Sequence, residues 1–230
     1  MDRLGGGEHQ LDFRYSDEQE MIRAMARDFS DNEIAPYAQQ WDKDNKMPDD
    51  ILKKMFDLGL LTIGIPAEYG GAGLDHVSQN LVVEEIAHGD AGVATAMTGS
   101  TLLGPDPVFI AATHEQKKWW YGRQNEGAVS GFCLTEPGAG SDAASLATKC
   151  VRDGNDYIIT GSKQFVTNGG IADLYTVFTT IDRKLGHKGM CAFMVDRNSP
   201  GITIGPKEDK LGIRCCNTTS VNFEEVRVPA

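Results

Sequence analysis

The chain of 230 residues lacks any apolar run that approaches the roughly 18 residues of a membrane-spanning helix. Its N-terminus lacks the apolar core of a secretory signal, and it is not the Arg-rich, acid-poor type of a transit peptide. Two interpretations follow: a targeting segment is missing from this chain, or the protein needs none.

Cysteine and histidine are scarce, with five of each. An odd number of cysteines, with Cys215 and Cys216 adjacent, does not suit the paired framework of a disulfide-rich secreted domain. None of the cysteines shows metal-ligand spacing, and the histidines are scattered. We therefore expect no metal site, and a reducing intracellular compartment fits the cysteine content best.

Basic residues are also scarce in the first part of the chain. Residues 1–130 carry 11 Lys and Arg against 22 Asp and Glu, whereas residues 131–230 carry 11 of each. Because nucleic-acid binding needs a basic surface, this balance argues against such a partner. The neutral second part is the better place for an anionic ligand such as a nucleotide.

Apolar residues follow helical spacing through the first part of the chain. Ser16 and Gln19 form a capping-box pattern that predicts a helix start, and Pro36 ends that helix. Further helices are expected over residues 48–59, 77–86, 91–103, 107–113 and 115–123. The stretch 91–103 has small side chains and no charge, which is typical either of close helix packing or of a helix that leaves room beside it.

From residue 131 the pattern changes to short runs rich in aromatic and β-branched residues. Strands are expected over residues 131–135, 157–160, 164–167, 174–179, 191–195 and 221–223. Gly161-Ser162 and Asn168-Gly169 predict hairpin turns. We predict an α+β fold, with an all-helical domain over residues 1–128 and an antiparallel β-barrel or sandwich domain over residues 129–230.

The stretch from Phe132 to Asp142 joins an apolar run to a loop of sequence Thr-Glu-Pro-Gly-Ala-Gly-Ser-Asp. Its glycines allow the backbone to approach a ligand, and successive amides in such a loop can form an anion-binding nest. A tight surface turn is the alternative, because glycine and proline commonly punctuate loops.

Two further stretches make the interpretation more specific. One is Gly161 to Gly170, with the sequence Gly-Ser-Lys-Gln-Phe-Val-Thr-Asn-Gly-Gly, and the other runs from Lys207 to Arg214 and continues at residues 221–229. In this order and spacing, the three motifs resemble the flavin-binding segments of the acyl-CoA dehydrogenases. The resemblance extends from about Ser16 to the last residue, and residues 180–211 look most like the short-chain members.

This resemblance implies an FAD site in the second domain. Thr135 is expected to bond the pyrimidine side of the flavin, and Thr167 is expected to donate near N5. Phe165 stands where many members carry Trp, although an aromatic on a strand is by itself more typical of a core. The full set of expected FAD contacts is Phe132, Leu134, Thr135, Gly140, Ser141, Phe165, Val166 and Thr167.

The resemblance also implies an acyl-CoA substrate, with its acyl chain along residues 91–103. Ser141 is expected between the FAD pyrophosphate and the pantetheine. His187 and Lys188 belong to a basic cluster with Arg183 and Lys184, which is expected either to contact a CoA phosphate or to be a solvated turn.

We assign no catalytic residue. The family's catalytic glutamate lies on a C-terminal helical bundle that this chain does not contain, so we expect the chain to be incomplete and inactive alone. Glu136, beside Pro137, is interpreted as fixing the loop, and Glu84 and Glu85 as structural. The resemblance implies fatty-acid β-oxidation on short- to medium-chain thioesters, an electron-transfer flavoprotein as electron acceptor, and a homo-oligomer. It also implies the mitochondrial matrix in a eukaryote, or otherwise the cytoplasm. The alternatives are a non-catalytic acyl-CoA- or FAD-binding remnant and an acyl-CoA oxidase.

Overall fold

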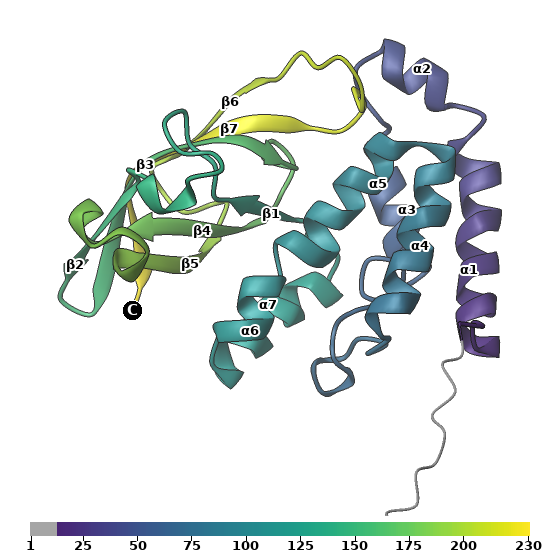
Figure 1. The fold of residues 1–230 in the computed structure, drawn as a ribbon, viewed down its shortest axis with the longest axis horizontal. Helices are drawn as coiled ribbons and strands as arrows, with labels where there is room; N and C mark the ends of the chain where they lie inside the picture. Colours follow the sequence, from purple (N-terminus) through teal and green to yellow (C-terminus); the bar gives the residue numbers. More distant parts are fainter. Residues whose placement is uncertain (1–12) are drawn as a thin grey trace, which may run out of the picture.

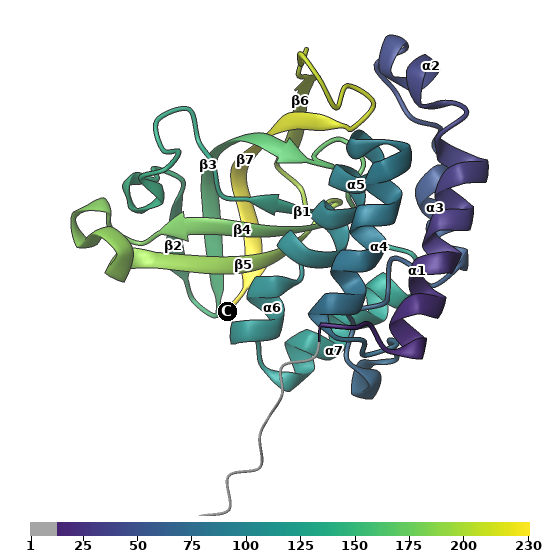
Figure 2. The ribbon, with the colours of Figure 1, turned by 45° about the vertical axis from the view of Figure 1, so that its right-hand side comes forward.

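The computed structural model describes residues 13–230, whose elements form two layers that lie side by side (Figure 1). Helices from the first part of the chain make one layer, and a curled sheet from the second part makes the other (Figure 2). None of the helices in this range is long and apolar enough to cross a membrane.

Every predicted helix is present in the helical layer. The α-helices are α1 (Asp17–Phe29), α2 (Ala38–Lys43), α3 (Ile51–Asp57), α4 (His76–Gly89), α5 (Ala91–Thr98), α6 (Asp106–Ala111) and α7 (His114–Asn125). Helix α2 was not predicted, because Trp41 is its one buried residue and a single apolar position shows no helical period. Two helices continue as π-helical turns: η1 (Ser30–Ile34) follows α1, and η3 (Gly99–Leu103) follows α5.

The predicted capping box at the start of α1 is confirmed. The Ser16 hydroxyl accepts a hydrogen bond from the Gln19 amide, and the Gln19 side chain accepts one from the Ser16 amide. Helix α1 packs against α4 through Glu85, which is 1 % exposed and accepts hydrogen bonds from Arg23 and Arg27. This ion pairing supports the structural interpretation of Glu85.

The sheet has seven strands among the described residues, in the order β1-β4-β2-β3-β7-β6, with β5 paired to β4. Their bounds are β1 (Ser130–Cys133), β2 (Lys149–Asp153), β3 (Asp156–Thr167), β4 (Leu174–Thr180), β5 (Met190–Asp196), β6 (Ile202–Lys207) and β7 (Thr218–Pro229). Three 3₁₀ segments complete the elements of the described residues: η2 (Ala67–Tyr69), η4 (Ala143–Ser145) and η5 (Arg183–Gly189).

The helix-then-sheet order is confirmed, but the sheet is mixed rather than wholly antiparallel. Strand β1 pairs with β4 in parallel, and β2 has one parallel pairing with β4. The reason is topological, because β1 pairs with β4, and β2 and β3 lie between these two strands in the sequence. No local sequence pattern predicts such a crossover connection. Strands β2 and β6 were missed, because their exposed and half-buried residues lack a clear apolar alternation.

The predicted hairpin turn at Gly161-Ser162 is wrong. Strand β3 runs through both residues, and its pairing with β7 shifts by a bulge between Ile159 and Gly161. Glycine is required there by close packing, because a Cβ on Gly161 would lie 2.6 Å from Cα of Thr148. Asn168-Gly169 does form a turn, but it leads from β3 to β4, which do not pair with each other.

Apolar side chains form a large cluster in each layer and a smaller cluster between the layers. The cluster of the helical layer also includes Cys215 and Cys216, from the connection between β6 and β7. The cluster between the layers joins Val108 of α6 and Trp120 of α7 to Leu174 of β4. The layers are therefore held together partly by apolar contact along the side of the sheet nearest α6 and α7.

Candidate functional site

The loop after β1 is closed into a turn by its own backbone. The Glu136 amide donates to the Ala139 carbonyl, and the Ala139 amide donates back to the Glu136 carbonyl. Pro137, Gly138 and Gly140 are exposed, as are Ser141 and Asp142. The loop thus presents its glycine backbone and the Ser141 hydroxyl to solvent, where a ligand could reach them.

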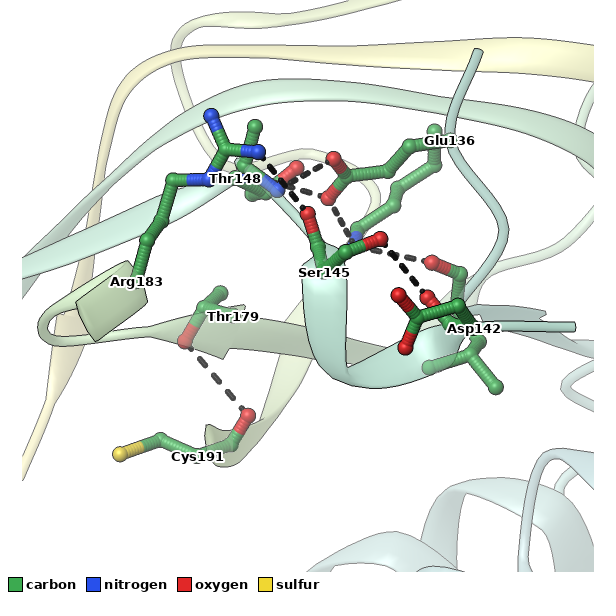
Figure 3. A network of polar contacts seen from close by, with 10 residues as sticks. Glu136, Asp142, Ser145, Thr148, Thr179, Arg183 and Cys191 are labelled. Carbon is green, nitrogen blue, oxygen red and sulfur yellow. Dashed lines mark hydrogen bonds and ion pairs between the residues drawn. The ribbon is translucent and has the colours of Figure 1, made fainter. Parts of the chain in front are cut away.

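A buried ion pair between Lys163 and Glu136 anchors this loop to β3. Lys163 of β3 is fully buried, and its Nζ lies 2.7 Å from Oε1 of Glu136 and 3.1 Å from the Leu134 carbonyl oxygen. The Glu136 carboxylate also accepts hydrogen bonds from the amides of Ala147 and Thr148, at 2.6 and 2.9 Å (Figure 3). The predicted loop-fixing role of Glu136 thus has a structural basis, whereas Lys163 was not singled out from the sequence.

Burial and pairing shift the pKa of both partners. Burial acts to raise the pKa of Glu136, but hydrogen bonds from Lys163, Thr148 and Ala147 outweigh it and hold that pKa below its ordinary value. Burial lowers the pKa of Lys163, and the bond to Glu136 opposes that shift. The carboxylate is thereby held in its charged, hydrogen-bonded form, which suits an anchor and not a proton-accepting base.

The second motif lies directly beside the first. The Gln164 amide donates to the Thr135 carbonyl at 2.8 Å, so the two predicted flavin segments are hydrogen-bonded neighbours. Phe165 has a left-handed φ of 56°, within a bulge between Lys163 and Val166, and its side chain is 58 % exposed. The interpretation of Phe165 as a core residue is therefore wrong, because the bulge turns the ring to solvent.

The end of β3 brings the site to the helical layer. A Cβ on Gly99 of η3 would lie 2.8 Å from Cγ2 of Thr167, so the π-helical turn touches this threonine. The predicted flavin-contact residue Thr167 and the predicted acyl-chain segment are therefore adjacent. Val166, in contrast, is buried in the apolar cluster of the sheet, with only 1 % of the residue exposed.

The basic cluster lies on η5, the connection between β4 and β5. Arg183 donates to the Ser145 carbonyl at 3.2 Å, and the Ser145 hydroxyl donates to the Asp142 carbonyl (Figure 3). This contact places η5 against the loop that carries Ser141, while His187 and Lys188 remain exposed. Both predicted interpretations of the cluster, a phosphate contact and a solvated turn, stay open.

These positions fit a flavin in two respects. The exposed aromatic ring of Phe165 supplies an apolar face, and the Gly140–Ser141 loop supplies backbone amides and a hydroxyl for an anionic group. Within residues 13–230 no group of three or more His, Cys, Asp and Glu residues could hold a metal ion.

Acid stability tests the two buried carboxylates. Hydrogen bonds from Arg27 and Arg23 lower the pKa of Glu85, and Glu136 shifts in the same direction. A carboxylate whose pKa is lower in the folded than in the unfolded protein stabilises the fold above its unfolded pKa of 4.5. This stabilisation is lost as the pH falls through the folded pKa.

We expect the free energy of unfolding by urea, measured from pH 7 to 3, to fall less steeply below pH 4.5 in Glu85→Gln than in the wild type. Glu84→Gln changes an exposed neighbour on α4 and should retain the steep fall; equal slopes for both variants would contradict the assignment.

Comparison with known proteins identifies the fold and its family. Residues 16–128 match the N-terminal domain of acyl-CoA dehydrogenases, and residues 131–226 match the middle domain. The short-chain specific acyl-CoA dehydrogenase of Bos taurus mitochondria is 40 % identical over 211 residues, covering 91 % of this chain and 51 % of that protein. The chain spans about half the length of the curated relatives it matches.

Solved structures agree with this assignment. Butyryl-CoA dehydrogenase from Megasphaera elsdenii superposes with a TM-score of 0.91 at 35 % identity, over 96 % of this chain and 59 % of that one. Glutaryl-CoA dehydrogenase from Mycobacterium smegmatis, solved in complex with FADH2, superposes with a TM-score of 0.85 at 31 % identity, over 94 % and 55 %. The predicted resemblance is confirmed: the chain belongs to the acyl-CoA dehydrogenase family.

Proposed function

We propose that this chain forms the FAD-binding and part of the acyl-binding structure of a short- to medium-chain acyl-CoA dehydrogenase. The observation that carries the proposal is the Gln164–Thr135 hydrogen bond, which sets the two flavin motifs side by side above the buried Lys163–Glu136 pair. The division into a helical domain through residue 128 and an FAD-binding domain from residue 129 is part of this proposal.

The residues that would hold FAD come from two elements. The first set lies in β1 and the loop after it and comprises Phe132, Leu134, Thr135, Gly140 and Ser141. The second set lies at the end of β3 and comprises Phe165, Val166 and Thr167. When bound, FAD would accept a hydride from the β-carbon of the thioester. Thr135 would orient the pyrimidine side, and the Thr167 hydroxyl would donate to the region that gains negative charge.

The substrate would lie between these residues and the helical layer. Its acyl chain would run beside α5 and η3, whose side chains are mostly small and where Gly99 meets Thr167. Ser141, His187 and Lys188 would contact the pantetheine and the CoA phosphates. We assign no proton-abstracting residue here, because Glu136 and Glu85 are both buried in ion pairs.

An electron-transfer flavoprotein would take the electrons, and the protein would act as a homo-oligomer. By analogy with its mitochondrial relative, it would work in the mitochondrial matrix of a eukaryote, or otherwise in the cytoplasm. These assignments concern the protein at its full encoded length.

The decisive assay uses that full-length protein with excess FAD, butyryl- to octanoyl-CoA and an electron-transfer flavoprotein or an artificial acceptor. Enoyl-CoA formation that depends on the acceptor supports the proposal. Product formed with equimolar peroxide in air would instead indicate an acyl-CoA oxidase. Binding of FAD or acyl-CoA without any product would indicate a non-catalytic binding protein.

Thr167→Val tests the flavin contact. Loss of one donor near the flavin should weaken FAD binding or shift its reduction potential by the equivalent of about 1–3 kcal/mol, with the fold intact. Flavin titration by fluorescence and a potentiometric titration measure the two effects. Thr160→Val makes the same change on the same strand away from the motif, and equal behaviour of the two variants would remove Thr167 from the site.

A further inference from the structure

The helix beside the proposed acyl site changes its winding just where it meets the sheet. Helix α5 is regular to Thr98, and the turn Gly99–Leu103 is π-helical, with the Gly104 amide bonded to the Gly99 carbonyl. A π-helical turn is rare, because it gives up the regular hydrogen-bond ladder, and such turns often mark functional sites. The carbonyls displaced by the change of winding need other partners.

Asn168 supplies one of those partners. Its Nδ2 donates to the Ala96 carbonyl of α5 at 2.8 Å and to the Ser130 carbonyl of β1 at 3.2 Å. Its own backbone is equally constrained, since its amide donates to the Asn217 carbonyl at 2.7 Å. The residue is fully buried, so these bonds are shielded from water.

Two other side chains hold the same turn. The Ser100 carbonyl accepts from Gln124 of α7 at 2.8 Å and from the Ser130 hydroxyl at 3.0 Å, and the Ser100 hydroxyl accepts from the Ser130 amide. The turn is therefore fastened to the sheet at Ser130 and Asn168, and to the neighbouring helix at Gln124.

Asparagine suits this position for two reasons. Its φ is 61°, in the left-handed region that asparagine and glycine tolerate better than other residues. Its amide nitrogen also has two donors, which match the two carbonyls that it meets. Aspartate would tolerate the backbone but would set a carboxylate against those carbonyls, and glycine would leave both without this partner.

Asn168 also affects the preceding residue, Thr167, because the π-helical turn contacts both of them. A Cβ on Gly99 would come within 2.8 Å of Cγ2 of Thr167 and 3.0 Å of Nδ2 of Asn168, so the turn rests directly on both. We propose that Asn168 is a positioning residue that sets the separation between Thr167 and the π-helical turn, and thereby the acyl-chain length that fits. This inference rests on the proposed function, since it assumes a thioester bound beside Thr167.

The test compares Asn168→Gly and Gly99→Ala with the wild type in the full-length protein. Asn168→Gly releases the turn, and Gly99→Ala inserts a methyl group between the turn and Thr167. Asn168→Gly should change the ratio of kcat/KM for butyryl-CoA to that for octanoyl-CoA by roughly threefold or more, the scale of one lost uncharged hydrogen bond. Gly99→Ala should also change this ratio, because its methyl group would displace Thr167. Asn45→Gly is the matched control, because Asn45 also has a left-handed φ, 56°, but lies between α2 and α3.

Amide hydrogen exchange gives a second readout that needs neither flavin nor substrate. Protection of residues 96–104 should fall in Asn168→Gly, while that of α1 stays at the wild-type level. A purely structural role would lower protection and overall stability without moving the chain-length ratio.

The outcomes separate this inference from the proposed function. A ratio that stays within twofold of wild type in both variants, with FAD still bound, overturns the positioning role. Unchanged exchange of residues 96–104 in Asn168→Gly overturns it as well. A wild type that binds no FAD refutes the proposed function instead, and the chain-length role falls with it.

Discussion

Lys163→Met is expected to lower the free energy of unfolding by about 3–5 kcal/mol, because it leaves the Glu136 carboxylate buried without its cation. Lys163 is fully buried, and its ammonium also bonds the Leu134 carbonyl in the predicted flavin loop. FAD affinity should fall in the same variant, since the loop from Leu134 to Thr148 loses its anchor in β3. Urea unfolding at pH 7 and flavin titration measure the two effects.

Two further variants decide whether the buried charge is the cause. Adding Glu136→Gln to Lys163→Met removes the unpaired charge and should recover part of the lost stability. Lys53→Met breaks an exposed pair with Asp57 on α3 and should cost no more than about 0.5 kcal/mol. A Lys163→Met variant as stable as Lys53→Met, or a double variant less stable than Lys163→Met alone, would refute the argument.

Trp120→Ala should be comparably destabilising, by about 3–5 kcal/mol, because it opens a large cavity between the two layers. Trp120 of α7 is fully buried and packs in the cluster that contains Val108 and Leu174. Its indole Nε1 has no hydrogen-bond partner, so the residue contributes through packing. Loss of this packing should also loosen the contact between α7 and β4.

The adjacent Trp119 provides a matched control. Trp119 is 41 % exposed, and the guanidinium carbon of Arg123 lies over its ring, 6.0 Å from the ring centroid. Such a cation–π interaction contributes about 0.5–1 kcal/mol at exposed sites. Trp119→Ala should therefore cost about 1 kcal/mol or less, and Trp120→Phe should fall between the two alanine variants. Equal midpoints in thermal and urea unfolding for the two alanine variants would contradict the assigned packing.

Local chemistry explains why the helices were predictable. The capping box at Ser16 acts within three residues, and the apolar periods of α1 and α4 each follow one continuous segment. The order of motifs likewise predicted the family, because Thr135–Asp142 and Gly161–Asn168 are contiguous in the sequence. The same contiguity supported Glu136 as a residue that fixes its own loop.

Other features depended on residues that are distant in the sequence. The sequence pattern predicts a turn at Gly161, but the structure places this glycine within β3, packed against Thr148. An aromatic on a strand is typical of a core, but the bulge between β3 and β7 turns Phe165 outward. The parallel pairing of β1 with β4 depends on which strand is reached after the crossover.

The sequence by itself determined the helix-then-sheet order, the capped start of α1 and the motifs of an acyl-CoA dehydrogenase, since each depends on neighbouring residues. Only the tertiary structure decided that Lys163 pairs with Glu136 of the predicted flavin loop and that Asn168 fastens α5 to the sheet. Both contacts join segments that are 27 and 72 residues apart. Lys163 bonds a carboxylate, whereas Asn168 bonds the main-chain carbonyl of Ala96. Because every residue has a main-chain carbonyl, the residue type at position 96 gives no indication of that contact.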